Sequence, residues 1–488
     1  MRSSSLSRTP SLEPLEERQL LANNVSAFVT RWGDLVVKGD AADNEIRVTQ
    51  GASVDQYVIE GLHGTTINGG NRAVVGDVED GLHFFLEGGN DYLGLIDLEA
   101  ASDIYILGLE GDDDLQLTGV TIGGDLEVRL EGDDNIIVDR ADIGETLHVL
   151  GGVGDQSLLI QDSAIAEQVS LPTRWDDDRV ALLRNVIASD LGVLLGTGDD
   201  ELWMESNQVL GRSLLDGGNG EGDAITPDVD ANNQFAQEPV VPYFETNTPL
   251  VQDVVFGYTP GIGPDQWHLL TPAWLYSTVG RRQSAIDLSL DDSVSVGEAP
   301  LAFDYTFSSN LEFFNSGNNI EVGFQNHPDN SVTDADGTVF VLQQIHFHSA
   351  SEHAIDGAHF PAEMHMVHQH QETGDALVVA VLLVEGTTPS GAWTELMTRL
   401  RADGLPTEVS LDPAELLPDA DDYFAYSGSL TTPPNSEGVR WRVFQEPVGL
   451  SMIDLEAIRS SIASSATVGL FGNNRPIQET NSRIVLDV

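Results

Sequence analysis

The sequence predicts a mainly β protein that is built from two different halves. Between residues 25 and 225, short apolar runs are separated by Gly- and Asp-rich turns that recur at a nearly constant spacing. From about residue 251 the apolar runs become longer, aromatic residues become common and histidines cluster. In both halves apolar and polar residues alternate, and a period of two is typical of strands. Helical patterns are confined mainly to residues 392–401 and 453–461.

The repeats of the first half predict a parallel β-solenoid. Its clearest turn glycines, Gly111, Gly132 and Gly152, are 20 to 21 residues apart. Strand-like runs that repeat at such a period are typical of stacked coils, in which each coil buries its apolar face against the next. The acidic turns lie at residues 87–91, 110–114, 131–135, 151–155 and 198–201.

The acidic turns allow two interpretations. They partly resemble the calcium-binding nonapeptide repeats, GGxGxDxUx, of bacterial secreted proteins, and this resemblance implies Ca²⁺ in the N-terminal repeats. Stacked carboxylates repel each other unless a hard cation or salt screens them. Most copies here lack the full glycine spacing, however, and the period is longer. In the other interpretation, Gly-Asp and Asp-Asp are simply residue pairs that favour turns.

Composition limits the partners that the chain can bind. Its 488 residues include 22 Lys and Arg against 79 Asp and Glu, which gives a formal net charge of −57 at pH 7. Such a surface repels nucleic acid and anionic lipid, and it suits a saline or extracellular medium or a matrix rich in divalent cations. The chain has no cysteine, so any metal must be held by histidines and carboxylates. No apolar run reaches the ~18 residues of a membrane span.

The N-terminal residues contain a sorting pattern. Glu13, Leu15, Glu16, Arg18, Leu20 and Leu21 match the ExLExRxLL segment found at the N-termini of exported proteins in some bacterial groups. This resemblance implies an exported protein, either extracellular or held at the cell surface or in the periplasm. The alternative is a short amphipathic helix with no sorting role.

These features divide the chain into four parts. The stretch at residues 226–250 is rich in Pro, Asn, Gln and acidic residues and lacks periodicity, so it predicts a linker. We therefore expect an export segment at residues 1–24, an acidic solenoid at 25–225, the linker at 226–250 and a separate domain at 251–488.

Histidines cluster in the second half. Seven of the chain's 12 histidines lie between His346 and His370. His346 and His348 are two residues apart in an alternating run, so on a strand their side chains point to the same face. His365 lies in a second alternating run, which a neighbouring strand can place beside the first. Three imidazole nitrogens with a fourth position left open are a ligand set of catalytic zinc, and the pattern predicts such a centre.

Two polar residues are placed to orient these imidazoles. Gln344 precedes His346 by two residues, and Glu363 precedes His365 by two, so each shares a strand face with a predicted ligand. A zinc-bound histidine needs a partner for its other ring nitrogen. The alternative, ordinary strand histidines on a solvated face, explains a single histidine better than it explains two such pairs on consecutive strands.

The motifs around these histidines carry a family resemblance. Residues 344–353 and 363–368 contain QxHFH, SEH and ExHxVH, and the combination resembles the α-class carbonic anhydrases. Further matching blocks at residues 280–287, 426–434 and 473–476 follow in the family order, and the resemblance spans roughly residues 251–488. It implies a central, mostly antiparallel twisted sheet of about ten strands. It also implies a zinc-dependent lyase that hydrates carbon dioxide to bicarbonate and a proton by zinc-bound hydroxide attack.

The resemblance implies a role for each matching residue. His346, His348 and His365 match the zinc ligands, Thr431 matches a hydroxyl that accepts a hydrogen bond from zinc-bound hydroxide, and Glu352 matches the carboxylate that accepts the Thr431 proton. His353 matches a buried structural histidine. The apolar pocket that holds carbon dioxide is matched by Val367, Val379, Leu430 and Trp441, and Thr432 lies at its edge. The remaining histidines of the cluster, His359, His368 and His370, are expected on solvated faces.

One position departs from the family. Residues 314–319 match the block that carries the proton-shuttle histidine of fast members, and the matching residue here is Asn318. An amide cannot relay a proton near neutral pH, whereas an imidazole can. We therefore expect turnover to be limited by proton release and to depend on buffer.

Two alternatives to an active enzyme stay open. The first is a catalytically silent relative used for binding, but such relatives typically lack a zinc ligand, and all three are present here. The second is an acidic, calcium-binding surface or matrix protein with a weak or silent carbonic-anhydrase-like domain. The expected partners are thus carbon dioxide and bicarbonate, and with the second alternative divalent cations or a cell-surface matrix.

Overall fold

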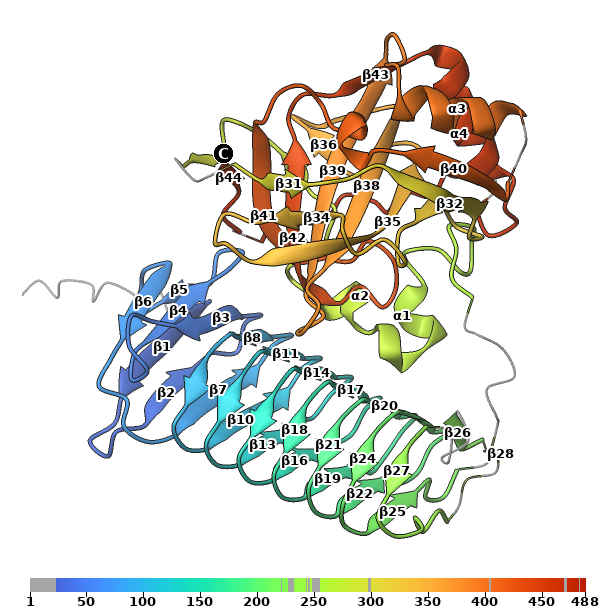
Figure 1. Ribbon diagram of the computed structural model, residues 1–488. Helices are drawn as coiled ribbons and strands as arrows, with labels where there is room; N and C mark the ends of the chain where they lie inside the picture. The colour runs from blue at the N-terminus through green and yellow to red at the C-terminus, as the bar shows by residue number, and fades with distance from the viewer. Residues whose placement is uncertain are drawn as a thin grey trace, which may run out of the picture.

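The computed structural model shows two β-rich parts that lie side by side (Figure 1). It describes residues 23–220, 222–226, 232–242, 244, 246–247, 255–296, 300–402, 405–468, 472–481 and 483–488. A stack of coils, coloured blue to green, runs along one side of a second domain, coloured yellow to red. The predicted export segment lies outside the described residues, apart from its last two. Among the described helices, none is long and apolar enough to cross a membrane.

The first part is the predicted parallel solenoid, with three long sheets along its axis. The first sheet contains β2 (Leu35–Lys38), β7 (Leu82–Gly88), β10 (Ile104–Glu110), β13 (Leu126–Arg129), β16 (Leu147–Leu150), β19 (Val169–Pro172), β22 (Leu191–Leu194) and β25 (Ser213–Asp216). The second contains β3 (Glu45–Gln50), β8 (Tyr92–Ile96), β11 (Asp114–Thr118), β14 (Asn135–Asp139), β17 (Ser157–Gln161), β20 (Arg179–Leu183), β23 (Glu201–Glu205), β26 (Ala224–Thr226) and β28 (Thr246–Asn247). The third contains β9 (Glu99–Ala100), β12 (Thr121–Ile122), β15 (Asp142–Ile143), β18 (Ala164–Ile165), β21 (Val186–Ile187), β24 (Gln208–Val209) and β27 (Gln234–Phe235).

The coils are slightly longer than the predicted 20 to 21 residues. Register partners such as Leu115 and Ile136 are 21 residues apart, and Leu202 and Ile225 are 23 apart. The prediction used Gly152, but Gly154 takes the left-handed backbone position of its turn, with φ of 112°. Glycine is required in this row because a Cβ at Gly132 would lie 1.8 Å from the carbonyl oxygen of Gly111 in the preceding coil.

The aspartates of the turns hydrogen-bond to the backbone of the adjacent coil. Oδ1 of Asp113 accepts from the Asp91 N–H at 2.9 Å, and Oδ1 of Asp200 accepts from the Asp178 N–H at 2.7 Å. Structural turn chemistry therefore explains the acidic repeats. The expected Ca²⁺ gains no support, because the described solenoid residues contain no set of three ligand side chains close enough to share a metal ion.

The N-terminal end of the solenoid is antiparallel, unlike the predicted uniform coils. β1 (Asn24–Val29) pairs with β2, and β4 (Tyr57–Gly61) pairs with both β3 and β6 (Arg72–Val75), all antiparallel. The short β5 (Thr66–Ile67) pairs parallel with β1. Apolar side chains of these hairpins join the solenoid core, so the hairpins cover the end of the stack as a cap, a common feature of terminal solenoid repeats.

The predicted linker at residues 226–250 is too long. Within it, β27 pairs with β24 and β28 pairs with β26, so these residues add a further, irregular coil to the solenoid. The Asn207 N–H donates to Oδ1 of Asn233 at 2.9 Å, so Asn233 continues a row of stacked asparagines. Strands of only two residues give no detectable periodicity, which is why the sequence pattern failed here.

The second domain contains the expected large sheet of mostly antiparallel strands. Along its main path the order is β30-β44-β41-β42-β39-β38-β35-β33-β32-β40. These strands are β30 (Val294–Ser295), β32 (Ser308–Asn315), β33 (Ile320–Gly323), β35 (Val339–His348), β38 (Ala362–Gln369), β39 (Ala376–Glu385), β40 (Thr407–Leu411), β41 (Tyr423–Ser429), β42 (Glu437–Phe444) and β44 (Leu486–Asp487). Beside the path lie β31 (Ala302–Asp304), β34 (Ser331–Thr333) and β43 (Val448–Leu450), and a small separate sheet holds β29 (Asp287–Leu288), β36 (Ala354–Ile355) and β37 (Ala358–His359).

Helices lie at the edges of this domain. The two predicted helices are confirmed as α3 (Ala392–Ala402) and α4 (Met452–Ala463), which pack against each other (Figure 1). The side chain of Ser451 caps α4 by accepting from the Asp454 N–H. The short α1 (Trp267–Leu270) and α2 (Tyr276–Val279) were not predicted, because helices of four residues leave no periodic signal.

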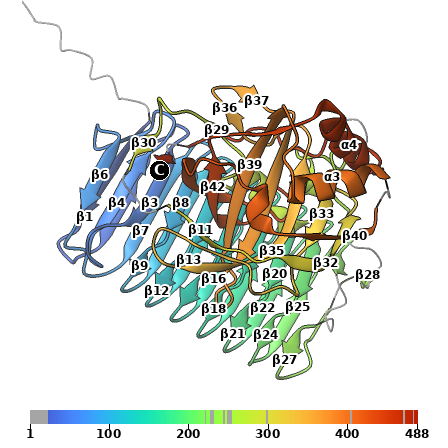
Figure 2. The ribbon, with the colours of Figure 1, turned by 45° about the horizontal axis from the view of Figure 1, so that its top comes forward.

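The two parts share a buried apolar contact. Side chains on the outer face of the second solenoid sheet, including Ile137 and Leu159, pack against Leu275, Tyr276 and Val279 around α2. Figure 2 shows the second domain lying over the middle coils of the solenoid. Strands in this region are buried on both faces, as the burial of every residue from Ile136 to Asp139 illustrates. The solenoid is therefore packed against the second domain and is more than a tethered neighbour.

Candidate metal centre

The three predicted zinc ligands meet on two adjacent strands. β35 and β38 pair antiparallel, and the register places His346 directly opposite His365 and His348 opposite Glu363. Alternation along each strand directs these side chains to one face of the sheet. All three histidines are buried, and together they form a group whose ligand atoms lie within 4.8 Å of one another.

Each imidazole is held through its outer nitrogen. Nδ1 of His346 lies 2.7 Å from Oε1 of Gln344, and Nδ1 of His348 lies 2.8 Å from the backbone oxygen of Asn473. Nε2 of His365 lies 2.8 Å from Oε1 of Glu363. All three partners are oxygen acceptors, so each outer nitrogen carries the proton and each inner nitrogen presents a lone pair. Gln344 and Glu363 thus take their predicted places, whereas Asn473 was not predicted as a partner.

The inner nitrogens converge on one point. Nε2 of His346 lies 2.9 Å from Nε2 of His348 and 3.2 Å from Nδ1 of His365. Neutral imidazoles would place three lone pairs against each other, an arrangement that a cation stabilises. Tetrahedral zinc with Zn–N bonds of ~2.0 Å separates its ligand nitrogens by about 3.3 Å, so the donor set fits zinc.

Burial keeps these imidazoles neutral, as metal ligands must be. It lowers the pKa of His346 well below its usual value and lowers that of His348 to about 4. Burial also lowers the pKa of His365, against the opposing effect of Glu363. For Glu363 itself burial would raise the pKa, but His353 and His365 together lower it well below its usual range.

Glu352 and Thr431 lie beside the histidines, as expected. The Glu352 carboxylate is fully buried, and its Oε1 accepts a hydrogen bond from the Arg475 N–H at 2.9 Å. Burial raises the pKa of Glu352 to about 7, and His365, the Arg475 N–H and the Thr431 side chain act in the opposite direction. Thr431 is buried as well, whereas Thr432 is partly exposed at the edge of the site.

An apolar pocket adjoins the centre, and one of its predicted members is wrong. Val367, Leu430 and Trp441 belong to one apolar cluster, and the member contributed by β39 is Val378. The predicted Val379 belongs to the main core on the opposite face of the sheet. Neighbouring strand residues point to opposite faces, so an error of one position in placing this strand exchanged the two valines.

The other histidines of the cluster differ in burial, and one of them differs from the prediction. His353 is buried, and its Nδ1 lies 2.6 Å from Oε1 of Glu363 and its Nε2 lies 2.7 Å from the Tyr426 hydroxyl. His359 is exposed and His370 is partly exposed. The prediction for His368 is wrong, because this residue is fully buried on the core face of β38.

Two contacts account for the buried position of His368. Its Nε2 lies 2.7 Å from the Tyr305 hydroxyl, and its Nδ1 faces the backbone oxygen of Leu377. Burial lowers the pKa of His368 to about 4. A neutral imidazole with both nitrogens in contact can replace an apolar side chain in this core.

The side chain of Asn318 is held in place by two hydrogen bonds. Its Oδ1 accepts from the Thr467 hydroxyl at 2.7 Å, and its Nδ2 donates to the backbone oxygen of Phe256 at 3.3 Å. The side chain is thus tied to the segment before α1. This arrangement agrees with the expectation that Asn318 relays no proton.

Sequence reasoning missed an acidic group opposite the ligands. Glu321 on β33 is the register partner of His346, which places both side chains on the same face. Burial raises the pKa of Glu321. The alternation of residues 320–323 was the available signal, but the pairing of β33 with β35 could not be read from the sequence.

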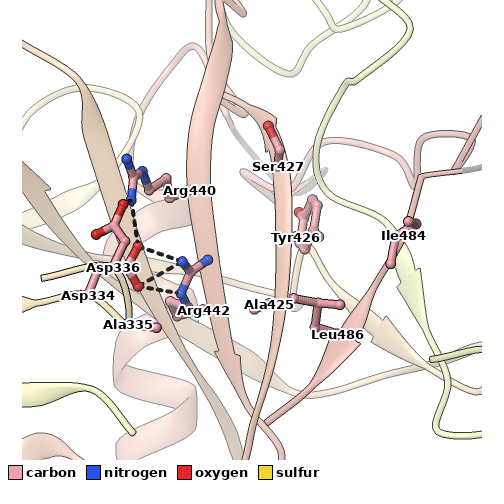
Figure 3. A pocket seen from close by; sticks show the side chains of 10 residues that line it. All are labelled: Asp334, Ala335, Asp336, Ala425, Tyr426, Ser427, Arg440, Arg442, Ile484 and Leu486. Carbon is pink, nitrogen blue, oxygen red and sulfur yellow. Dashed lines mark hydrogen bonds and ion pairs between the residues drawn. The ribbon is translucent and has the colours of Figure 1, made fainter. Parts of the chain in front are cut away.

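A separate surface cavity lies away from this centre. Its volume is about 640 Å³, and it is lined by residues of β41, β42 and the C-terminal segment (Figure 3). Nη2 of Arg442 donates to both carboxylate oxygens of Asp334 at 2.7 Å and its Nε donates to Oδ1 at 3.0 Å, while Arg440 donates to Asp334 and Asp336. None of the predicted site residues lines this cavity. Its charged groups are paired with each other, and the histidine centre remains the candidate site.

Comparisons with known proteins agree with this geometry. A family model described as eukaryotic-type carbonic anhydrase matches residues 262–488. A carbonic anhydrase of Pectobacterium carotovorum is 35% identical over 237 residues, which are 48% of this chain and 91% of that protein. A carbonic anhydrase of Nostoc sp. strain PCC 7120 is 31% identical over 248 residues, which are 50% and 89% of the two chains.

A similar solved structure covers the same half. It is the complex of the α-carbonic anhydrase of Thermovibrio ammonificans with the inhibitor sulfanilamide, 36% identical, with a TM-score of 0.42. The match covers 48% of this chain and 100% of that one. The family match begins at residue 262, so it does not extend into the solenoid.

Proposed function

The chain belongs to the carbonic anhydrase family through its C-terminal half, and from this we infer that it catalyses the reversible hydration of carbon dioxide to bicarbonate and a proton. The observation that carries the proposal is the convergence of three imidazole lone pairs, with each outer nitrogen fixed by a separate acceptor. His346, His348 and His365 would hold the zinc ion. When bound there, zinc supplies a Lewis acid that lowers the pKa of a water ligand to about 7.

Glu352 and Thr431 orient the reactants. Oε1 of the Glu352 carboxylate is anchored by the Arg475 N–H, and the Thr431 side chain lowers the pKa of Glu352, so this carboxylate is placed to accept the hydroxyl proton of Thr431. A hydroxyl whose proton is donated to Glu352 can act only as an acceptor toward its other neighbours. A fixed direction of this kind contributes to rate because the attacking group is already aligned when substrate arrives.

The apolar cluster beside the imidazoles suits a small neutral substrate. Val367, Val378 and Leu430 offer no polar side-chain atoms, and the indole N–H of Trp441 donates to the backbone oxygen of Ser429 at 3.0 Å. Carbon dioxide can enter such a pocket without losing hydrogen bonds. Bicarbonate, which is charged, is better solvated in water than beside these side chains, so the pocket favours release of the product.

Stopped-flow assays of carbon dioxide hydration on the full chain test the proposal. We expect activity that requires one zinc ion per chain, a loss of activity in His365→Ala, and a decrease of about 100-fold in Thr431→Val, which keeps the shape of the side chain but removes the hydroxyl. His370→Ala is the matched control, because this histidine is partly exposed and lies outside the centre. Full activity in zinc-free protein or in His365→Ala contradicts the assignment.

We also propose that the protein is exported, which places hydration at or outside the cell surface. Support comes from the ExLExRxLL pattern of residues 13–21 and from the formal charge of −57. The direct test is cell fractionation of a bacterium that expresses the full chain or a chain lacking residues 1–24. Export that is unchanged by the deletion would assign the segment no sorting role.

A further inference from the structure

A chain of buried hydrogen bonds connects the solenoid to the metal centre. It begins at Gln116 on β11, whose side chain points away from the solenoid core toward the second domain. Gln116 is fully buried, and its Nε2 donates to Oε2 of Glu437 at 2.6 Å. Its Oε1 accepts from the Tyr92 hydroxyl at 2.9 Å, so the orientation of the amide is fixed from the solenoid side.

The chain continues through the second domain. Oε1 of Glu437 accepts from Nε2 of Gln283 at 3.1 Å, and Oε1 of Gln283 accepts from Nη1 of Arg475 at 2.8 Å. The backbone N–H of Arg475 donates to Oε1 of Glu352 at 2.9 Å. Every side chain of this path has a relative exposure of 4% or less.

The position of Glu437 makes Gln116 important. Glu437 is a buried carboxylate at 0% side-chain exposure, and its Oε2 has two donors among the described residues: Gln116 at 2.6 Å and Nε of Arg282 at 3.4 Å. Loss of the Gln116 amide would leave Oε2 of this buried carboxylate with one long contact, while Oε1 keeps the Arg282 backbone N–H at 2.6 Å and the Gln283 amide at 3.1 Å, and an under-satisfied buried carboxylate oxygen is costly. Glu437 would then move toward other donors and disturb Gln283, its link to Arg475.

We propose that Gln116 of the solenoid is a positioning residue of the carbonic anhydrase centre, acting through Glu437, Gln283 and Arg475 on Glu352. This inference rests on the proposed function in that Glu352 orients Thr431. It gives the solenoid an indirect part in the reaction, since one of its residues completes the support of the active site.

The test compares Gln116→Met with Tyr276→Phe in the full chain. Methionine keeps the length of the side chain and removes the amide's three hydrogen bonds, to Tyr92, Glu437 and Thr118. Tyr276→Phe is the matched control, because the Tyr276 hydroxyl also bridges the two domains, with contacts to Thr118 at 3.0 Å and Asp139 at 2.9 Å, and it touches the path only through Thr118, which accepts from Nε2 of Gln116 at 3.3 Å.

Hydrogen exchange of the metal-free protein gives the first readout. We expect the peptide that carries the Arg475 amide to exchange about tenfold faster in Gln116→Met and at the wild-type rate in Tyr276→Phe. In the zinc-loaded protein we expect kcat to fall about tenfold with KM unchanged, as for other residues that support ligands from a distance. Equal effects of the two variants on exchange and kcat, or no effect of Gln116→Met, would assign Gln116 only a role in domain adhesion.

A gentler variant keeps the test decisive if Gln116→Met does not fold. Tyr92→Phe removes the hydroxyl that fixes the Gln116 amide, and we expect a smaller increase of exchange at Arg475 in the same direction. An unchanged rate in this variant overturns the proposal. Wild-type protein without hydration activity would refute the proposed function alone, because the exchange experiment uses neither metal nor substrate.

Discussion

Replacing Asp178 with asparagine should stabilise the solenoid, and more so at higher pH. Asp178 is fully buried, and its Oδ1 accepts from the Gln156 N–H at 2.8 Å. An asparagine amide oxygen can accept a bond of this kind, as Oδ1 of Asn207 does from the Asn185 N–H of the preceding coil at 3.0 Å. The substitution therefore removes a buried ionisable group and keeps the backbone hydrogen bond.

The expected magnitude follows from the pKa of Asp178, which burial raises from 3.8 to about 8. A carboxyl whose pKa is higher in the folded than in the unfolded chain is bound to more protons when folded, so its ionisation destabilises the fold as pH rises from about 4 to 8. At pH 7 this penalty is about 2 to 4 kcal/mol, and at pH 5 it is at least about 1 kcal/mol smaller. Asp178→Asn removes the penalty at both pH values.

Urea unfolding of the full chain at pH 5 and pH 7 measures this difference. Asp177→Asn is the matched control, because Asp177 lies in the exposed neighbouring row, where its Oδ1 accepts from the Asp199 N–H at 2.8 Å. We expect little change in the control at either pH. An Asp178→Asn chain that is less stable than wild type at pH 7, or that gains equally at both pH values, would refute the account of a strained buried carboxylate row.

Four other variants test the centre and the contact between the domains. Asn318→His should raise turnover in weak buffer several-fold and have little effect in concentrated imidazole; equal turnover of variant and wild type in weak buffer contradicts a missing proton relay. Val378→Tyr should reduce kcat/KM for carbon dioxide at least tenfold by filling the apolar pocket, whereas Val379→Ile should leave kcat/KM nearly unchanged; the opposite order would return Val379 to the pocket. Leu159→Ala, in the contact between the domains, should lower the free energy of unfolding by about 2 to 5 kcal/mol with kcat unchanged. Urea unfolding measures this loss, and a value below about 1 kcal/mol would show that the contact is loosely packed.

The sequence predicted the centre well because its information is local. The HxH pattern of β35 and the ExH pattern of β38 define strand faces through alternation alone, and the outer partners Gln344 and Glu363 lie two residues from their ligands. The same locality explains the error at Val379, since a shift of one residue exchanges the two faces of a strand. Asn473 escaped prediction because it reaches His348 from 125 residues away along the chain.

The sequence predicted the solenoid architecture, but it did not predict where the regular coils begin and end. Gly and Asp turns at a regular interval defined the coils, whereas the antiparallel cap and the coil formed by β27 and β28 depend on pairings that leave no repeat in the sequence. The contact between the domains could not be predicted either. Gln116 lies at an outward-facing position of β11, and the alternation of this strand alone would predict that its side chain is exposed to solvent.

X-ray absorption spectroscopy at the zinc edge tests the central claim most directly. We predict one zinc ion per chain with three imidazole nitrogens at about 2.0 Å and one further light atom, and loss of this signal in His348→Ala. A second group of potential ligands, formed by His353, Glu363 and His365, shares one histidine with the proposed set. A spectrum with two imidazoles and a carboxylate, retained in His348→Ala, would place the metal in that second group and contradict the account.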